Sequence, residues 1–570
     1  MLDFKKIIAE KLHEEVPELE VDQFLSLIEI PPDSKMGDYA FPTFSLAKIK
    51  RKSPQMIAEE IKESLGDLES FEKIEVVGSY LNFFVDRKAL AELMLGQVKE
   101  EKEEFGRTNY GENRPVVVEY SSPNIAKPFH IGHIRTTVIG DSLKRIYEFL
   151  GYDVTSINHL GDYGTQFGMM IEAYKLWGNR EVIESNPIPE LVKLYVRINQ
   201  EAEEKPELLD NSREWFRKLE EKDEEAVALW KWFREVSLDE FQRVYKLLDI
   251  EFDSYRGESY YSDLMPAVVQ EMEDKGVLVE SDGAKIVDLE EYKLPPSIIV
   301  KRDGSTIYLT RDITAAKFRK DTYDFYKNIY VVGSQQNLHF QQLVAILDKM
   351  GYEWSKDCIH VPFGMVSLED GTLSTRRGKV LYLEDVLNRA ISQVDEILSK
   401  REEELGVVME NRKELAEQVG IGAVKFQELF NQRIKDYVFD WEKTLSFEGE
   451  TGPYVQYTHA RINSLLAKGN FQLDNKVNPA LLTNEEEIRL LQLLYGFADI
   501  IVDAHLKNEP YFITRYIVEA AKTFNKFYNA TTILTEEEEL TNTRLLLCYG
   551  VKNMIKRGLD LLGIQAPEKM

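Results

Sequence analysis

The feature that most constrains this chain is a strand, loop, helix and strand pattern between residues 115 and 160. Residues 115–120 form a short apolar run typical of a buried strand, and residues 153–160 form a second one. Between them, apolar side chains repeat on one helix face, at Ile139, Leu143, Ile146 and Leu150. The pattern predicts a βαβ unit whose first loop, residues 121–133, ends at a helix N-terminus. Unpaired backbone N–H groups at such a terminus favour an anion such as phosphate.

Two histidines and a lysine lie in this loop. His130 and His133 are three residues apart, and Gly132 between them has no side chain to keep a nucleotide away from the backbone. The imidazoles could hydrogen-bond the phosphates of ATP as charge moves onto the leaving pyrophosphate, and Lys127 adds a mobile cation. The pair could instead bind a metal, but no third ligand follows at a recognisable spacing, or it could merely cap or pack the helix. The lysine and a Pro-Asn turn in the same loop favour a functional site.

The extended motif resembles a known family. Residues 119–135 read EYSSPNIAKPFHIGHIR, in which the HIGH segment resembles the signature of class I aminoacyl-tRNA synthetases and the longer string resembles that of arginyl-tRNA synthetases. The resemblance implies ATP-dependent activation of L-arginine to arginyl-adenylate and transfer to the 3′-terminal adenosine of tRNA(Arg). It implies ATP and ATP-bound Mg²⁺ without a dedicated protein metal site, and catalysis by His130, His133 and Lys127. In this family activation commonly needs bound tRNA.

A second set of residues is expected to hold arginine. Asp-Gly turns at 282–283 and 303–304 predict two hairpins, the second leading through strand-like residues to Asp312, where a helix is expected to begin. Asp312 could cap that helix, or its carboxylate could accept a bidentate pair from a guanidinium. The resemblance implies the second role and an arginine pocket made of Ser122, Asn124, His133, Tyr308, Asp312 and Gln336. The turn at 161–167 follows the second strand of the βαβ unit and should line the same site.

The remaining ATP contacts are expected in two loops. Residues 329–332 read as a strand followed by a polar loop and a helix, and the resemblance places Gln335 and His339 of that loop beside the ligands. Residues 372–380 resemble the second class I signature, but Thr375 stands where a lysine is usual. Lys127 could compensate for that missing lysine. The basic residues of the loop are further candidates: Arg376, which is expected to contact ATP, and then Arg377 and Lys379. The sequence does not fix which of them replaces it.

The C-terminal part is expected to bind tRNA. Apolar residues repeat on one helix face at Leu490, Leu494, Phe497 and Ile501, which predicts a helix bundle. Residues 452–461 and the chain end resemble the anticodon-binding bundle of the family. By this match, the residues that stack on or hydrogen-bond to anticodon bases are expected to be Tyr454, Tyr457, Arg461 and Met570. The tyrosines could equally be core or rim aromatics.

These patterns predict an α/β protein of four regions, since 570 residues are too many for one core. The expected fold is a Rossmann-like doubly wound catalytic domain (109–384) with an N-terminal α+β domain (1–108) and a C-terminal helical bundle (451–570). A helical connecting region (385–450) precedes the bundle. The N-terminal domain resembles the additional tRNA-contacting domain of the family, although its aromatics could be simply core. A helical insertion is expected around 170–260, and its aromatics are expected to pack in the core.

Composition limits the location and partners. The longest apolar runs are far shorter than a membrane span, and residues 1–20 lack a signal-peptide core, so we expect a cytoplasmic protein with no membrane partner. Cys358 and Cys548 lie in apolar runs and are expected to be reduced core residues. A monomer is the working expectation, although the sequence does not fix the oligomeric state.

The charge distribution permits a nucleic-acid partner without predicting one. The net charge of −28 argues against such a partner at first, but residues 451–570 carry only −1 and the first 450 residues carry −27.

Two alternatives to arginine-tRNA ligase stay open. One is another nucleotidyltransferase with the same HxGH loop, and the other is a non-catalytic tRNA-binding paralogue.

Overall fold

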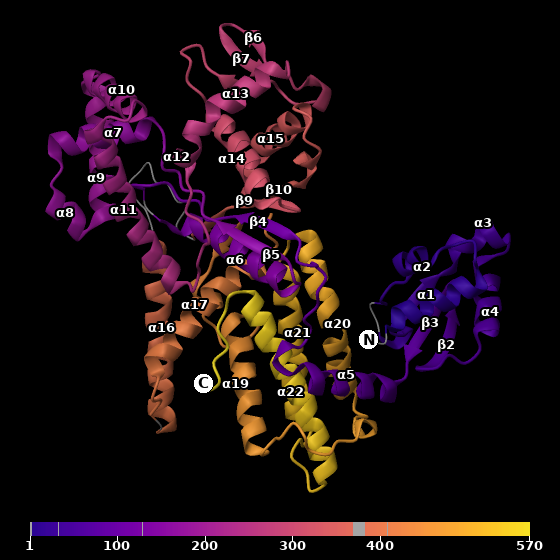
Figure 1. Cartoon of the computed structure of the whole chain (residues 1–570). Helices are drawn as coiled ribbons and strands as arrows, with labels where there is room; N and C mark the ends of the chain where they lie inside the picture. The colour runs from indigo at the N-terminus through magenta and orange to yellow at the C-terminus, as the bar shows by residue number, and fades with distance from the viewer. Residues whose placement is uncertain (1–2, 32–33, 128, 369–381, 407) are drawn as a thin grey trace. The chain divides into compact units, whose positions relative to one another are not determined.

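One part of the chain is built around a four-stranded parallel sheet (Figure 1). The structure is a computed structural model and describes residues 3–31, 34–127, 129–368, 382–406 and 408–570. The strand order of this sheet is β10-β9-β4-β5, with β4 (Pro115–Glu119), β5 (Asp153–Ile157), β9 (Lys327–Gly333) and β10 (Cys358–Phe363). The chain runs from β4 to β5 on one side and returns to β9 on the other. The sheet is therefore wound in both directions from β4, which confirms the predicted fold class and places ligands at the carboxyl ends of β4 and β9.

Helix α6 (Ile134–Phe149) connects β4 to β5, as the apolar spacing predicts. Ile139, Leu143, Ile146 and Leu150 are all buried. A short 3-10 turn, η4 (Ile131–His133), precedes the helix, and the Thr137 hydroxyl donates to the His133 carbonyl (2.7 Å). The first turn of α6 thus carries the histidine motif directly to the sheet edge.

A run of five helices follows β5: α7 (Thr165–Trp177), α8 (Arg180–Ser185), α9 (Pro187–Glu204), α10 (Glu207–Glu220) and α11 (Glu224–Leu247). Trp232 and Phe233 of α11 are buried, as expected of core aromatics. Trp215 and Trp230 are half-buried, and their indole N–H groups donate to Glu172 (3.0 Å) and to the Asp162 carbonyl (2.7 Å). The first contact joins α10 to α7, and the second fastens α11 to the turn after β5.

The predicted hairpin at 282–283 is present in an antiparallel sheet of β6 (Val279–Ser281), β7 (Ala284–Val287) and β8 (Ser297–Val300). The second predicted hairpin, which turns at 303–304, has no second strand directly after its turn in the described structure, so that part of the prediction is wrong. Only one bridge, between Val300 and Thr306, follows β8 before helix α14 (Tyr308–Tyr323) begins. Asp312 consequently lies inside the helix and is neither its cap nor its first-turn acid. The reason is tertiary packing, because Leu309 and Ile313, one helical turn apart, are both buried in the core.

By contact density the chain divides into two compact units. One contains the parallel sheet and consists of Arg107–Ala460, Ala498–Val518 and Lys556–Met570. Besides the elements above it holds α12 (Glu258–Tyr261), α13 (Met265–Asp274), α15 (Asn337–Lys349), α16 (Leu383–Leu405), α17 (Arg412–Phe430) and α18 (Trp441–Thr444). It also holds a short parallel pair, β11 (Val366–Leu368) with β12 (Tyr437–Phe439).

The other unit consists of Met1–Gly106, Arg461–Phe497 and Glu519–Ile555. Its sheet has the order β1-β3-β2, with β1 (Tyr39–Pro42), β2 (Phe71–Val77) and β3 (Tyr80–Val85), and its first helices are α1 (Phe4–Glu15), α2 (Val21–Leu27), α3 (Ala47–Lys50), α4 (Pro54–Leu65) and α5 (Arg87–Glu101). Helix α4 begins at Pro54 because the Ser53 hydroxyl accepts from the Met56 N–H (3.4 Å).

Four long helices make up the C-terminal bundle, α19 (Gly452–Lys468), α20 (Glu485–Lys507), α21 (Tyr511–Ala530) and α22 (Glu538–Leu561). The apolar face predicted on α20 is buried at all four of its positions. Cys358 and Cys548 are free and buried, as expected. Among the helices that the structure describes, none is long and apolar enough to cross a membrane.

Candidate active site at the carboxyl ends of the parallel strands

The loop after β4 has an unusual backbone. Ser121 (φ 70°), Ser122 (φ 48°) and Ala126 (φ 58°) all adopt left-handed conformations that side chains disfavour. The Ser121 hydroxyl shares hydrogen bonds with the Thr137 hydroxyl (2.8 Å) and the Tyr245 hydroxyl (2.7 Å), so α6 and α11 hold the loop in this shape. Backbone strain that surrounding contacts stabilise is typical of functional loops.

His130 and His133 lie with their rings close together, with centroids 4.1 Å apart. The Gly132 N–H donates to His130 Nδ1 (3.0 Å), and the His130 N–H donates to His133 Nδ1 (3.2 Å). Because its Nδ1 accepts a hydrogen bond, the His130 ring carries its proton on Nε2 and can donate it to a ligand. His133 Nδ1 also lies 3.3 Å from the His130 carbonyl, so this ring either accepts at Nδ1 from the His130 N–H or donates there to the carbonyl. A Cβ at position 132 would lie 2.8 Å from His130 Cε1, which explains the glycine.

Both imidazoles are neutral at physiological pH. Burial lowers the pKa of His130. Burial, the neighbouring His130 and the Lys127 cation lower the pKa of His133 to about 3. The pair can therefore stabilise phosphate oxygens by hydrogen bonding, and the positive charge has to come from elsewhere.

Lys127 is the cation nearest to this pair in the same loop. It is half-buried, and burial lowers its pKa while the Glu258 carboxylate acts to raise it. Tyr382 forms an antiparallel bridge with His130, and the Leu383 N–H donates to the Phe129 carbonyl (2.9 Å). The second signature loop, with Thr375, Arg376, Arg377 and Lys379, lies outside the described residues.

Asp312 lies in a cluster with two histidines and a tyrosine. His339 Nε2 donates to Asp312 Oδ2 (2.6 Å), and His159 Nε2 lies 3.9 Å from Asp312 Oδ1. The Tyr308 ring lies against the His339 ring, with centroids 4.9 Å apart. Burial acts to raise the pKa of Asp312, but the His339 hydrogen bond and the nearby His159 and Arg319 lower it overall, so the carboxylate is ionised. The structure thus groups His339, predicted to contact ATP, with the predicted guanidinium ligands.

The other predicted arginine ligands lie in the loops that follow β4 and β9. Asn124 is exposed and forms a parallel bridge with Gly161, whose carbonyl accepts from the Ile125 N–H (3.1 Å). A Cβ at position 161 would lie 2.3 Å from Asn124 Oδ1, so the glycine permits this close approach. Ser122 is half-buried, and its hydroxyl donates to the Tyr120 carbonyl (3.4 Å). Gln335 and Gln336 are exposed in the 3-10 turn η7 (Ser334–Gln336) that follows β9.

No motif singled out Glu258, which is the first residue of α12. Burial raises its pKa to about 6, His159 and Arg311 oppose this, and Asp312 adds to it. Arg311 Nη1 lies 3.4 Å from Glu258 Oε2. Glu258 thus lies within electrostatic range of both Lys127 and Asp312.

Asp162, inside the predicted turn at 161–167, positions Glu258. Its buried carboxylate accepts from the Ser259 N–H (2.8 Å) and from Arg234 Nε (2.9 Å). These bonds fix the start of α12 against the end of β5 and against α11. A buried acid next to a glycine in a ligand-lining turn is the signal that could have singled it out.

The predicted tRNA ligands are located on α19 and at the chain end. Arg401 Nη2 donates to the Tyr457 hydroxyl (3.4 Å), and Tyr454 is half-buried. In the other unit, Arg461 Nη1 donates to Asn525 Oδ1 (2.6 Å). Met570 is half-buried, in a tail that α19 holds through the Gln456 amide, which donates to the Gln565 carbonyl (2.8 Å).

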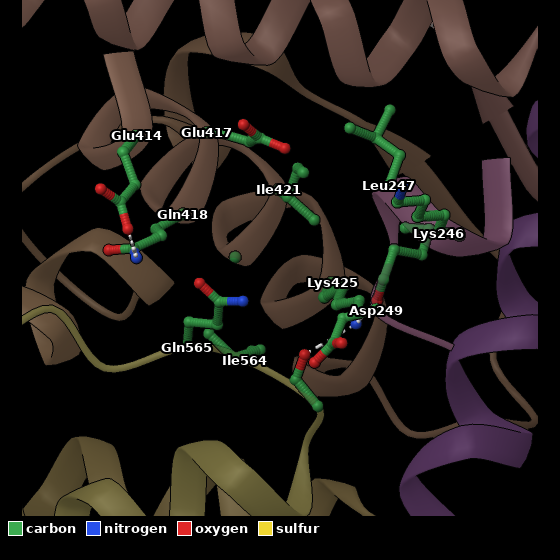
Figure 2. Close-up of a pocket in the computed structure, with 13 residues that line it drawn as sticks. Lys246, Leu247, Asp249, Glu414, Glu417, Gln418, Ile421, Lys425, Ile564 and Gln565 are labelled. Carbon is green, nitrogen blue, oxygen red and sulfur yellow. Dashed lines mark hydrogen bonds between the residues drawn. The ribbon is translucent and has the colours of Figure 1, made fainter. Parts of the chain in front are cut away.

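A pocket of the sheet-containing unit contains none of the predicted site residues (Figure 2). It is lined by the end of α11, by α17 and by the tail residues Gly563, Ile564 and Gln565. Lys425 Nζ is buried and donates to the carbonyls of Leu248 and Gly563 (2.7 Å for Gly563). Its contacts therefore fasten the tail to α17 and α11.

Three family matches cover the described elements. The family described as "tRNA synthetases class I (R), catalytic domain" matches residues 95–441. The "DALR anticodon binding domain" matches residues 455–570, and the "Arginyl tRNA synthetase N terminal domain" matches residues 3–85. Together with the doubly wound sheet and the histidine motif, these matches define a class I aminoacyl-tRNA synthetase.

Similar proteins narrow the class to one family. An arginine–tRNA ligase of Halothermothrix orenii is 55% identical over 570 residues, and that of Clostridioides difficile is likewise 55% identical, each covering 100% of both chains. The solved arginyl-tRNA synthetase of Thermus thermophilus superposes with a TM-score of 0.82 at 25% identity and covers 100% of both chains. The chain belongs to the arginyl-tRNA synthetase family, which confirms the resemblance read from residues 119–135.

Proposed function

We propose that this chain attaches arginine to tRNA in two steps at the edge formed by the carboxyl ends of β4 and β9. In the first, an arginine carboxylate oxygen attacks the α-phosphate of ATP, forming arginyl-adenylate and releasing pyrophosphate. In the second, a hydroxyl of the 3′-terminal adenosine of tRNA attacks the arginyl carbonyl and AMP leaves. The observation that supports this most is that the neighbouring strands β5, β4 and β9 each lead into the site. Asp312 is hydrogen-bonded to His339 after β9 (2.6 Å) and lies 3.9 Å from His159 after β5, while the histidine pair follows β4.

The phosphate half of the site consists of His130, His133, Gly132 and Lys127. In this proposal the two Nε2–H groups donate to phosphate oxygens as charge develops, the glycine lets the nucleotide approach the backbone, and Lys127 supplies positive charge. Arg376 is a further proposed ATP ligand. Mg²⁺ bound to ATP would neutralise phosphate oxygens. Among the described residues, no group of three or more His, Cys, Asp or Glu side chains could hold a metal ion.

The guanidinium half consists of Asp312, Tyr308 and Glu258. Two carboxylates on one side of a pocket match the charge and the fork of donors of a guanidinium, and the Tyr308 ring offers a face for stacking. His339 orients the Asp312 carboxylate through its hydrogen bond. Ser122, Asn124 and Gln336 are proposed to hold the amino-acid end, close to His133.

Recognition of tRNA is proposed for both ends of the chain. Tyr454, Tyr457, Arg461 and Met570 would contact anticodon bases by stacking and hydrogen bonding. In the N-terminal region, exposed Phe44 lies against Tyr80 (ring centroids 5.3 Å apart), close in sequence to a run of basic residues at 48–52. An aromatic pair beside cations suits an unpaired base and its phosphates.

One experiment tests the proposal. Bulk tRNA is incubated with the protein, ATP, Mg²⁺ and each of the labelled amino acids in turn. We expect charging with arginine alone, and arginine-dependent exchange of pyrophosphate into ATP that requires added tRNA. Charging with another amino acid, or none with arginine, would reject the proposal. We further propose that the protein is cytoplasmic and monomeric. Light scattering at micromolar concentration tests the monomeric state.

A further inference from the structure

Arg135 is one of the most deeply buried large side chains of the molecule, although it carries a full charge. It belongs to the first turn of α6, two residues after His133, and its side chain is 1% exposed. Its Nη1 donates to two backbone carbonyls, Gly364 (2.9 Å) and Lys435 (2.8 Å). Its Nε lies 3.4 Å from Glu428 Oε2. A single guanidinium therefore joins the start of the helix to three distant segments.

The segments that Arg135 joins meet at a tight backbone crossing. Gly364 lies between β10 and β11, and Lys435 lies just before β12, the strand that pairs with β11. A Cβ at position 364 would lie 2.7 Å from the Lys435 carbonyl carbon and 2.8 Å from the Ile434 oxygen. The crossing thus leaves no room for a side chain at 364, and the guanidinium is the group that ties it to α6.

The Arg135 guanidinium is also fixed from the side of α17 and β12. The Tyr437 ring lies 5.2 Å from the Arg135 guanidinium carbon, and the Tyr437 hydroxyl donates to the Glu428 carboxylate. Among the described residues, Arg135 and Tyr437 are the charged or titratable groups that face Glu428 from neighbouring elements. Glu509, which lies near Arg433, interacts with Arg135 in turn.

Stability alone does not account for this arrangement. A buried arginine–glutamate pair pays a large desolvation cost, and apolar residues of similar volume often replace such pairs without loss of stability. What apolar residues cannot supply is a rigid planar group whose Nη1 donates to both carbonyls while its Nε faces Glu428. The arrangement is suited to fixing geometry next to His133.

We propose that Arg135 is a positioning residue for amino-acid activation, holding the first turn of α6, and with it His133, in register with the crossing between β11 and β12. This inference rests on the proposed function and adds a residue that contacts no substrate. Arg135 acts through His133, so it affects the phosphate half of the site. The Asp312 cluster lies on α14 and α15, which Arg135 does not contact in the described structure.

The test measures arginine-dependent pyrophosphate exchange of the full chain with tRNA present. Arg135→Lys keeps the charge, but its ammonium ends one bond short of the Nη1 position and it lacks the Nε that faces Glu428. We expect kcat to fall about 10- to 100-fold because small misplacements of a catalytic group are costly, with the arginine KM within about twofold of wild type. The matched control is Arg145→Gln, which breaks an ion pair with Asp141 (2.8 Å) further along the same helix. Its kcat should stay within about twofold of wild type. A folded Arg135→Lys with wild-type kcat, or a rise confined to the arginine KM, would overturn the inference.

A second variant keeps the test decisive if Arg135→Lys does not fold. Burial raises the pKa of Glu428 to about 7, so the wild-type enzyme should lose kcat as the pH falls from 8 to 6 and the partner of Arg135 is protonated. Glu428→Gln should lower kcat at pH 8 by about 3- to 10-fold and flatten this limb. An unchanged limb in Glu428→Gln would contradict the inference. If the wild-type protein charges tRNA normally in such a case, the proposed function stands and only the role of Arg135 fails.

Discussion

Both halves of the candidate site are partly buried, but their side chains differ in charge. Around His130 and His133, burial removes charge, and hydrogen bonds with the backbone orient neutral rings that can still donate a proton to a ligand. Around Asp312, a histidine hydrogen bond keeps a half-buried carboxylate ionised, while burial raises the pKa of neighbouring Glu258 to about 6. In the proposed mechanism, the phosphate half responds to developing charge, whereas the guanidinium half holds a charge that is present throughout. Damage to the first should lower kcat, and damage to the second should raise the arginine KM.

The largest effect is expected at the phosphate half. His133→Ala removes an Nε2–H donor that acts as negative charge develops, so kcat for arginine-dependent pyrophosphate exchange should fall about 10²- to 10³-fold. The arginine KM should change by less than about threefold, because the guanidinium ligands are untouched. Steady-state exchange over a range of arginine concentrations measures both. A variant that keeps kcat and loses arginine affinity would erase the distinction between the halves.

Asp312→Asn should produce the reverse pattern. The change keeps the shape of the side chain but removes the charge that pairs with the guanidinium, so the arginine KM should rise roughly 10²-fold. At saturating arginine, kcat should fall less than about tenfold. Competition between arginine and citrulline, its neutral analogue, provides the control, since the preference for arginine should narrow in this variant. An unchanged KM would remove Asp312 from the pocket.

The pH dependence of the arginine KM tests the role of Glu258. With a pKa of about 6, it is ionised above pH 6 and loses its charge as the pH falls through that value. The wild-type arginine KM should therefore rise roughly tenfold between pH 7 and pH 5, because one of two carboxylates facing the guanidinium is neutralised. Glu258→Gln should have a raised and flatter KM over the same range. If the wild-type KM does not change over this range, Glu258 does not contact arginine.

Asp162→Asn should give the smallest effect. The buried Asp162 carboxylate touches no proposed ligand and acts by holding the start of α12, so the arginine KM should rise only about threefold, with kcat preserved. Thermal unfolding measured in parallel separates this positioning role from general loss of fold. A loss of kcat larger than the change in KM would place Asp162 in the phosphate half instead.

Short-range patterns were sufficient for the phosphate half. The apolar strand runs, the helix spacing and the loop chemistry of residues 121–133 are all local, so the βαβ unit and its histidine motif could be read directly from the chain. The helix start at Tyr308 could not. Ile307, Tyr308 and Leu309 follow an Asp-Gly turn and favour a strand by local preference, and only the burial of Leu309 together with Ile313 selects the helix.

The guanidinium half depended on the family resemblance and on the fold. Asp312 and Tyr308 were assigned by matching the family, whereas Glu258 stood in no motif. It reaches the site because Asp162 and Arg234, far apart in sequence, fix a helix of four residues. The pairing of His339 with Asp312 is likewise a contact between two helices that no local pattern encodes.

The most direct measurement is a crystal structure with a non-hydrolysable arginyl-adenylate analogue. It should show the analogue's guanidinium within hydrogen-bond distance of Asp312 and the oxygens of its phosphate mimic facing Nε2 of His130 and His133. An analogue bound with the guanidinium directed away from Asp312, or with the phosphate mimic remote from both imidazoles, would contradict the assignment of the two halves.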